Sequence, residues 1–99
     1  MYHPILTDKA ISDINKAKKW YNEQQENLGE KFTDYVFKFI DDIKNYPTAL
    51  PRKHKNTREI FIKKYPYLII YSIEEKVIFI LRVFPCKTSP KKKYKKLKK

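Results

Sequence analysis

The sequence predicts an α+β fold: a short N-terminal strand, a helical hairpin and then a three-stranded antiparallel β-sheet, in the order βααβββ. Apolar residues recur at helical spacing through the first half of the chain. Two later segments, residues 67–73 and 76–84, are apolar and rich in β-branched and aromatic side chains. Because 99 residues form one domain with a single core, we expect residues 1–90 to be that domain. Residues 91–99, rich in lysine, are expected to be a flexible tail.

The first two elements are a strand and a helix. Residues 2–6 are typical of a short strand, and Thr7 is a suitable N-cap for the helix that follows. Asp8 then lies in the first turn, where a carboxylate meets the positive end of the helix dipole. The apolar stripe of this first helix consists of Ala10, Ile11, Ile14, Ala17 and Tyr21, with Trp20 beside it, while Asp13, Lys16, Lys19 and Glu23 fall elsewhere.

A second helix begins near Glu30. Gly29 is the only glycine, so we expect it to take a positive φ at the end of the first helix or in the connection. The second helix ends before Pro47. Its stripe is the strongest periodic signal in the chain: Phe32, Tyr35, Val36, Phe39, Ile40 and Ile43. A short link between two helices predicts an antiparallel hairpin that lies on the sheet.

Three strands follow a loop over residues 48–56. The first is expected over residues 58–64, and Tyr65 with Pro66 ends it. Glu74 and Glu75 mark the tip of a hairpin that joins the last two strands.

These last two strands are apolar on both faces, whereas a sheet in a small protein usually has one face in water. In the first, Leu68 and Ile70 point one way and Tyr67, Ile69, Tyr71 and Ile73 the other. In the second, strict alternation sets Ile78, Ile80 and Phe84 against Val77, Phe79, Leu81 and Val83. The helical hairpin covers one face, so the other requires a second cover.

The charge of the chain is uneven. The net charge is +12, and residues 52–99 carry sixteen Lys and Arg against three Glu. A basic surface of this kind favours nucleic acid or the ribosome as a partner, although twenty of the basic residues are lysine and a coding bias also supplies lysine. A single cysteine, Cys86, and the lack of a long apolar run predict a cytoplasmic protein that is not in a membrane.

Several segments together resemble the RelE/ParE superfamily of toxins from type II toxin–antitoxin systems, also called plasmid stabilisation proteins. The resemblance rests on Trp20-Tyr21, on residues 28–32, on Arg58 at the start of a strand, on residues 64–71 and on Val83-Phe84 followed by residues 89–93. It implies a helical hairpin on an antiparallel sheet. It also implies a partner, because members of this superfamily are held inactive by an antitoxin.

The second apolar face is where an antitoxin segment would bind, as an amphipathic helix or an added strand. The residues expected to bind it are Tyr67, Ile69, Tyr71, Phe79 and Leu81. The alternative is that the N-terminal region, the loop over residues 48–56 and the tail close this face themselves.

Members of the RelE type cut mRNA on the ribosome, and the resemblance then makes Arg58, Arg82 and Tyr94 the candidate catalytic residues. Arginine suits a phosphate clamp, and a tyrosine among lysines loses its proton more easily than a free one. The alternative for the two arginines is an ion pair with Glu59, Glu74 or Glu75. The candidate nucleic-acid-binding residues are Arg52, Lys53, Lys55, Arg58, Arg82, Lys87, Lys91, Lys92 and Lys93.

The chain departs from the superfamily where many relatives carry a histidine and an arginine, since it has Pro85 and Thr88 there. The ParE branch, which inhibits DNA gyrase by binding, needs no general base, so this departure leaves a gyrase inhibitor as possible as an mRNA endonuclease. A third interpretation is a non-toxic basic accessory protein that binds RNA or DNA. His54 and Cys86 lack catalytic neighbours in the sequence, and their spacing predicts no metal site and no cofactor. The oligomeric state is left open.

Overall fold

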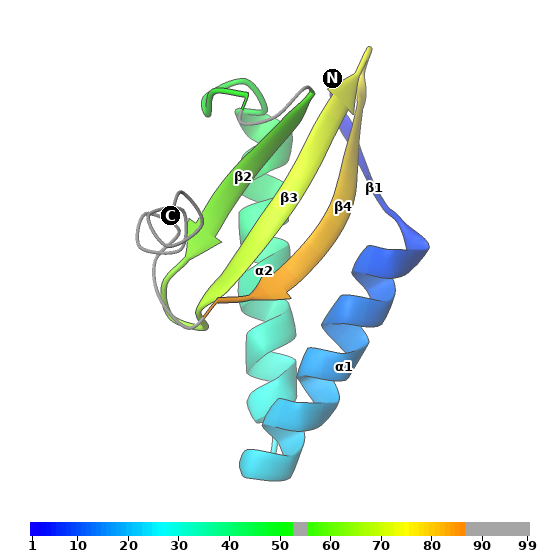
Figure 1. Ribbon diagram of the computed structural model, residues 1–99. Coiled ribbons are helices and arrows are strands. Elements are labelled where there is room, and N and C mark those ends of the chain that lie inside the picture. The colour runs from blue at the N-terminus through cyan, green and yellow to red at the C-terminus, as the bar shows by residue number, and fades with distance from the viewer. Residues whose placement is uncertain (53–55, 87–99) are drawn as a thin grey trace, which may run out of the picture.

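The computed structural model describes residues 1–52 and 56–86, and it has the predicted order of elements (Figure 1). The elements are β1 (His3–Leu6), α1 (Asp8–Gln24), α2 (Leu28–Asn45), β2 (Thr57–Ile62), β3 (Tyr67–Glu74) and β4 (Val77–Pro85). Both helices pack against the same face of the sheet, and in Figure 1 α2 runs behind the sheet while α1 lies below it and to the right. The α+β fold is therefore confirmed, with boundaries that differ by a residue or two from those expected.

The four strands form a single mixed sheet in the order β1-β4-β3-β2. β2 pairs antiparallel with β3, and β3 with β4, as predicted, whereas β1 pairs parallel with β4. A parallel neighbour needs a long crossover, and α1 and α2 lie within the connection between these two strands. The N-terminal strand is thus an edge of the main sheet.

The start of α1 is fixed to the sheet by Thr7. Its Oγ1 accepts a hydrogen bond from the backbone N–H of Ala10 at 3.1 Å, which confirms the predicted N-cap. The same hydroxyl donates to the carbonyl oxygen of Leu81 at 3.0 Å. One side chain therefore caps the helix and ties it to β4.

The turn between the helices differs from the expectation for Gly29. Asn27 takes the left-handed conformation, with φ 66°, and Gly29 lies inside α2. The glycine is needed for a different reason: a Cβ at this position would lie 2.3 Å from the backbone oxygen of Lys18 on α1. Gly29 N–H also donates to Oδ1 of Asn22 at 2.7 Å. The missing side chain thus lets the two helices approach closely.

The core lies between the helices and one face of the sheet. Phe32, Val36, Ile40 and Ile43 of α2 are buried there, as their spacing predicts, together with Ala10, Ile14 and Ala17 of α1. The sheet contributes Ile62, Tyr67, Ile69, Tyr71, Ile78, Ile80 and Val83. Strict alternation along β4 was therefore wrong for Val83, which we had placed opposite Ile78 and Ile80.

A β-bulge at Leu81 is the reason for this difference. Tyr71 pairs with Ile80 and Ile70 pairs with Arg82, so Leu81 is an extra residue in β4. After one extra residue the alternation reverses, which brings Val83 to the core face. Phe84 pairs with Leu68 and so lies on the face turned away from the helices.

Candidate functional site

The two candidate arginines of the strands lie on different strands and on different faces. They are not on adjacent strands, because β3 lies between β2 and β4. Arg58 pairs with Tyr71, and Arg82 pairs with Ile70. Consecutive residues of β3 point to opposite faces, so the two arginines leave opposite faces of the sheet. The structure therefore does not bring them together into one phosphate clamp.

Arg58 holds the chain that follows α2. Its Nη1 donates to the carbonyl oxygen of Leu50 at 2.9 Å. The neighbouring Tyr71 hydroxyl donates to the carbonyl oxygen of Pro47 at 3.1 Å, and burial raises the pKa of this phenol. Two adjacent side chains thus anchor the segment after α2 to the sheet.

Arg82 forms a two-point ion pair with Asp13 of α1. Its Nε donates to Oδ2 at 2.7 Å, and its Nη2 donates to Oδ1 at 3.0 Å. Oδ2 of Asp13 also accepts the backbone N–H of Val83 at 2.9 Å. The guanidinium lies over the ring of Phe84, 4.3 Å from its centroid. The partner of Arg82 is therefore neither Glu59, Glu74 nor Glu75.

These contacts stabilise the charged forms of both partners. Burial alone would raise the pKa of Asp13, but the hydrogen bonds from Arg82 and Val83 and the nearby positive charges more than offset it. The pKa of this carboxyl therefore lies below its ordinary value of 3.8. The hydrogen bond with Asp13 raises the pKa of Arg82. At neutral pH the pair is fully ionised.

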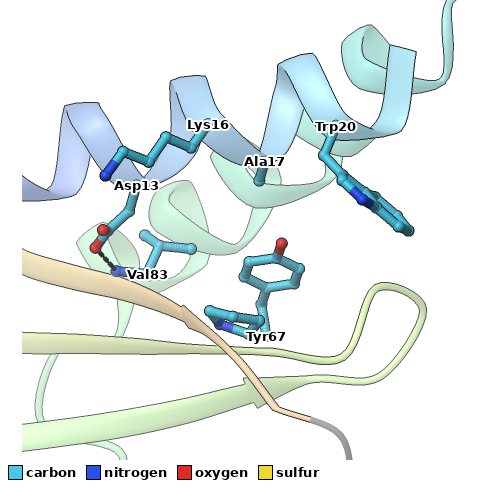
Figure 2. A pocket seen from close by; sticks show the side chains of 7 residues that line it. Asp13, Lys16, Ala17, Trp20, Tyr67 and Val83 are labelled. Carbon is cyan, nitrogen blue, oxygen red and sulfur yellow. Dashed lines mark hydrogen bonds between the residues drawn. The ribbon is translucent and has the colours of Figure 1, made fainter. Parts of the chain in front are cut away.

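A cleft of about 210 Å³ lies beside this ion pair, between α1 and the end of β4 (Figure 2). Its walls are mainly apolar, and Lys16 with Asp13 forms a polar rim. The lining residues are Asp13, Lys16, Ala17, Trp20, Tyr67, Val83 and Pro85. Ligand pockets for drug-sized molecules measure about 300–1,000 Å³, so this cleft is too small for most cofactors.

The phenol of Tyr67 points from β3 toward α1, between Ala17 and Trp20 in Figure 2. Burial, the proximity of Tyr21 and a hydrogen bond with its phenol raise the pKa of Tyr67 to about 12. A general base works best with a pKa near the working pH. Tyr67 is thus a poor proton acceptor at neutral pH. Within residues 1–52 and 56–86 no cluster of three His, Cys, Asp or Glu side chains could bind a metal ion.

The family model of the ParE toxin of the type II toxin–antitoxin system parDE matches this chain over residues 5–90. The chain belongs to the ParE toxin family. Among curated proteins, no sequence matches this ParE family member.

Solved structures of toxin–antitoxin proteins share the fold of this ParE family member. A chain of the chromosomal ParDE system from P. aeruginosa is 19% identical, with a TM-score of 0.66 over 88% of this chain and 98% of that one. A chain of the intact E. coli RelBE toxin–antitoxin complex is 18% identical, with a TM-score of 0.66 over 89% and 100%. The isolated E. coli RelE toxin is 17% identical, with a TM-score of 0.66 over 99% and 98%.

The residues expected to bind an antitoxin lie in three different places in the ParE fold. Ile69 and Tyr71 are buried in the core under the helices, with exposures of 0% and 1%, so their assignment to a free surface was wrong. Tyr67 is also a core residue but lines the cleft. Phe79 and Leu81 of β4 are half-buried.

Some of the predicted site residues lie outside the described part of the chain. These are Lys53, Lys55, Lys87, Lys91, Lys92, Lys93 and Tyr94, and His54 and Thr88 lie outside it too. Arg52 is described and exposed. Nucleic-acid binding by this set stays a prediction. No helix among the described residues has the length and apolar character that crossing a bilayer requires.

The residues of the cleft that the sequence analysis missed all lie on α1. Asp13, Lys16 and Trp20 were assigned to the wet side of the helix or to its margin. They follow each other by three and four residues, which places them on one face, and Ala17 of the core lies on that face too. The sequence pattern that could have indicated the cleft is the position of Asp13 and Trp20 on the same helix face as the apolar residue Ala17.

Proposed function

We propose that this chain is the cytoplasmic toxin of a type II toxin–antitoxin pair and that it acts by binding DNA gyrase, not by cutting mRNA. The proposal combines membership of the ParE family with the chemistry at the end of β4. A binding mechanism needs a shaped surface but no group that moves protons. The ParE branch implied by the sequence resemblance acts in this way.

The observation that carries the proposal is the two-point ion pair between Arg82 and Asp13. A site that cleaves RNA must gather cations around the phosphate and place an acid and a base beside it. Here one guanidinium is neutralised by a carboxylate, and the other candidate, Arg58, holds a loop on the opposite face. Pro85 has no side-chain group for proton transfer, and the nearby phenol of Tyr67 has a pKa of about 12. This arrangement favours binding over cutting.

A cognate antitoxin is the second part of the proposal. Similar folds occur in the ParDE system and in the RelBE complex, both of which pair a toxin with an antitoxin. The net charge of +12 makes an acidic antitoxin segment a suitable partner. Such a partner would keep the chain inactive until it is removed.

The test is to express the chain from an inducible promoter in bacteria that carry no antitoxin for it. We expect growth arrest with gyrase-dependent DNA breaks and an SOS response, while mapped transcript ends stay as in uninduced cells. In a purified supercoiling assay, the chain should inhibit gyrase. Transcript cuts that appear on ribosome-bound mRNA, without DNA breaks, would contradict the proposal and favour the endonuclease. Normal growth with folded protein would favour the non-toxic accessory protein.

Two arginine variants make the test sharper. In the gyrase mechanism, Arg58→Gln and Arg82→Gln should still arrest growth when compared at equal amounts of folded protein. In a phosphate-clamp mechanism, either substitution should abolish the arrest. Arg52→Gln, at an exposed position of the loop, is the matched control for loss of one positive charge.

A further inference from the structure

The cleft between α1 and the end of β4 has a wall formed by the only tryptophan of the chain. The side chain of Trp20 is large and apolar, yet the residue is 54% exposed. Its ring contacts Tyr21 edge to face, with centroids 5.0 Å apart, and Tyr21 in turn stacks on Phe32 of the core at 5.1 Å. The indole is therefore held in place by aromatic packing while it remains accessible.

From this geometry we infer that the cleft receives one bulky apolar side chain from an acidic peptide segment of the antitoxin. The inference rests on the antitoxin part of the proposed function and names where, and by what chemistry, that partner is held. A volume of about 210 Å³ suits a single side chain better than a cofactor. Apolar anchors that enter preformed pockets with aromatic walls are typical binding hot spots.

The charges around the cleft select an acidic partner. Asp13 is already paired with Arg82 and accepts the N–H of Val83. Lys16 is exposed at the rim and forms no salt bridge within the described residues. Two cations thus face one carboxylate, so the rim has an excess positive charge. A carboxylate on either side of the apolar anchor would find a partner there.

A peptide can also bind by adding a strand to the edge of a sheet, but the free edge of β4 does not suit this mode. β1 covers this edge only as far as Ile80. Beyond it, the N–H of Val83 is taken by Asp13, and Pro85 has no N–H to offer. A partner strand would find no backbone donors at these two residues. At this end of β4 the partner segment is therefore held by its side chains.

The test starts from a displayed library of short random peptides, selected on the purified chain and counter-selected on Trp20→Ala. We expect enrichment of acidic sequences that share one Leu, Ile, Met or Phe anchor. A synthetic copy of an enriched peptide is then titrated while the emission of Trp20, the single tryptophan, is recorded. Binding should shift the emission to shorter wavelength and protect the indole from acrylamide, because the anchor displaces water from the cleft.

Two pairs of variants then test the anchor and the charge by the anisotropy of a labelled peptide. Trp20→Ala should weaken binding by about 30-fold or more, as expected for a hot spot. Phe37→Ala, which removes another exposed aromatic residue, should change it by less than about twofold. Lys16→Glu should weaken binding by about tenfold at low salt, and Lys38→Glu, with the same charge change on α2, much less.

Three outcomes would overturn the inference: no enriched peptide, equal binding to the chain and to Trp20→Ala, or saturation without a change in Trp20 emission. None of these measurements involves gyrase or growth. The peptide test and the cellular test of the proposed function can therefore fail independently of each other.

Discussion

The two faces of the sheet have similar apolar composition but opposite surroundings. On the helix side, Ile69, Ile78 and Ile80 are fully buried, each with 0% exposure. On the other side, Phe61, Phe79 and Phe84 are only half-buried, and Ile5 is 48% exposed. No described helix covers this second face (Figure 1). The comparison shows that hydrophobic residues in a strand do not by themselves mark the core.

The difference between the faces is one of burial and not of residue type. A buried side chain on the helix side is enclosed by other side chains, so truncation leaves a cavity. A half-buried side chain on the second face loses less, because water can fill the space that it leaves. The following predictions test this contrast, from the largest expected effect on the free energy of unfolding to the smallest.

Ile80→Ala should have the largest effect, a loss of about 2–5 kcal/mol in the free energy of unfolding, because it leaves a cavity under the helices. Urea denaturation of the purified chain measures this loss. A cost below about 1 kcal/mol would mean that the helix side is no better packed than the exposed face.

Gly29→Ala should destabilise the chain by about 1–3 kcal/mol, because the new methyl group meets the backbone oxygen of Lys18. Helix propensity alone predicts the opposite sign, a gain of about 1 kcal/mol. Thermal unfolding distinguishes the two by direction. A stabilised variant would show that α1 and α2 are further apart than in the structure. The helices would then pack less closely over their face of the sheet.

Asp13→Asn should cost about 1–2 kcal/mol at neutral pH, since hydrogen bonds to a charged group contribute more than neutral ones. The pKa of Asp13 is lowered in the folded chain, so its contribution is present above the unfolded value of 3.8. It is lost as the pH falls through the lower folded value. The difference between wild type and variant, measured by denaturation at several pH values, should therefore shrink below pH 3.8.

A control for this pH series is Asp34→Asn, at an exposed position on α2. It should leave the stability within about 0.5 kcal/mol of wild type at every pH. If both variants follow the same pH curve, the ion pair with Arg82 is not what the titration reports.

Phe79→Ala should have the smallest effect, about 1 kcal/mol or less, although the side chain removed is larger than that of Ile80. It is half-buried on the second face and leaves no enclosed cavity. The neighbouring residues Phe79 and Ile80 thus form a matched pair on one strand. Equal losses for the two in urea denaturation would contradict the contrast between the faces.

Much of the fold could be predicted because its signals are local. The stripe from Phe32 to Ile43 fixes α2 and its buried side, and the hydroxyl of Thr7 marks the start of α1. The parallel pairing of β1 had no such signal, because the sequence of a four-residue strand does not indicate which strand it pairs with or in which direction. The bulge at Leu81 was hidden for a related reason: β4 is apolar on both sides of it, so a reversal of alternation changes no pattern.

The candidate site was harder to predict, because its geometry depends on contacts between distant residues. Arg82 was identified, but its partner Asp13 lies 69 positions away. The assignment of faces in β3 also needed the helices in place, since Tyr67, Ile69 and Tyr71 look as suited to a partner as to a core. In this chain the sequence predicts which residues have unusual chemistry, and the tertiary contacts decide what that chemistry is used for.

The hydrogen bond between the Thr7 hydroxyl and the carbonyl oxygen of Leu81 also affects the timing of folding. These residues are 74 positions apart, and among the described strands β1 pairs only with β4. During synthesis the N-terminal strand must wait until β4 has left the ribosome, because contacts between distant residues close late. The cleft beside Trp20, whose floor includes Val83, is completed in the same step. A nascent chain thus acquires this binding surface only after almost all of the domain has been made.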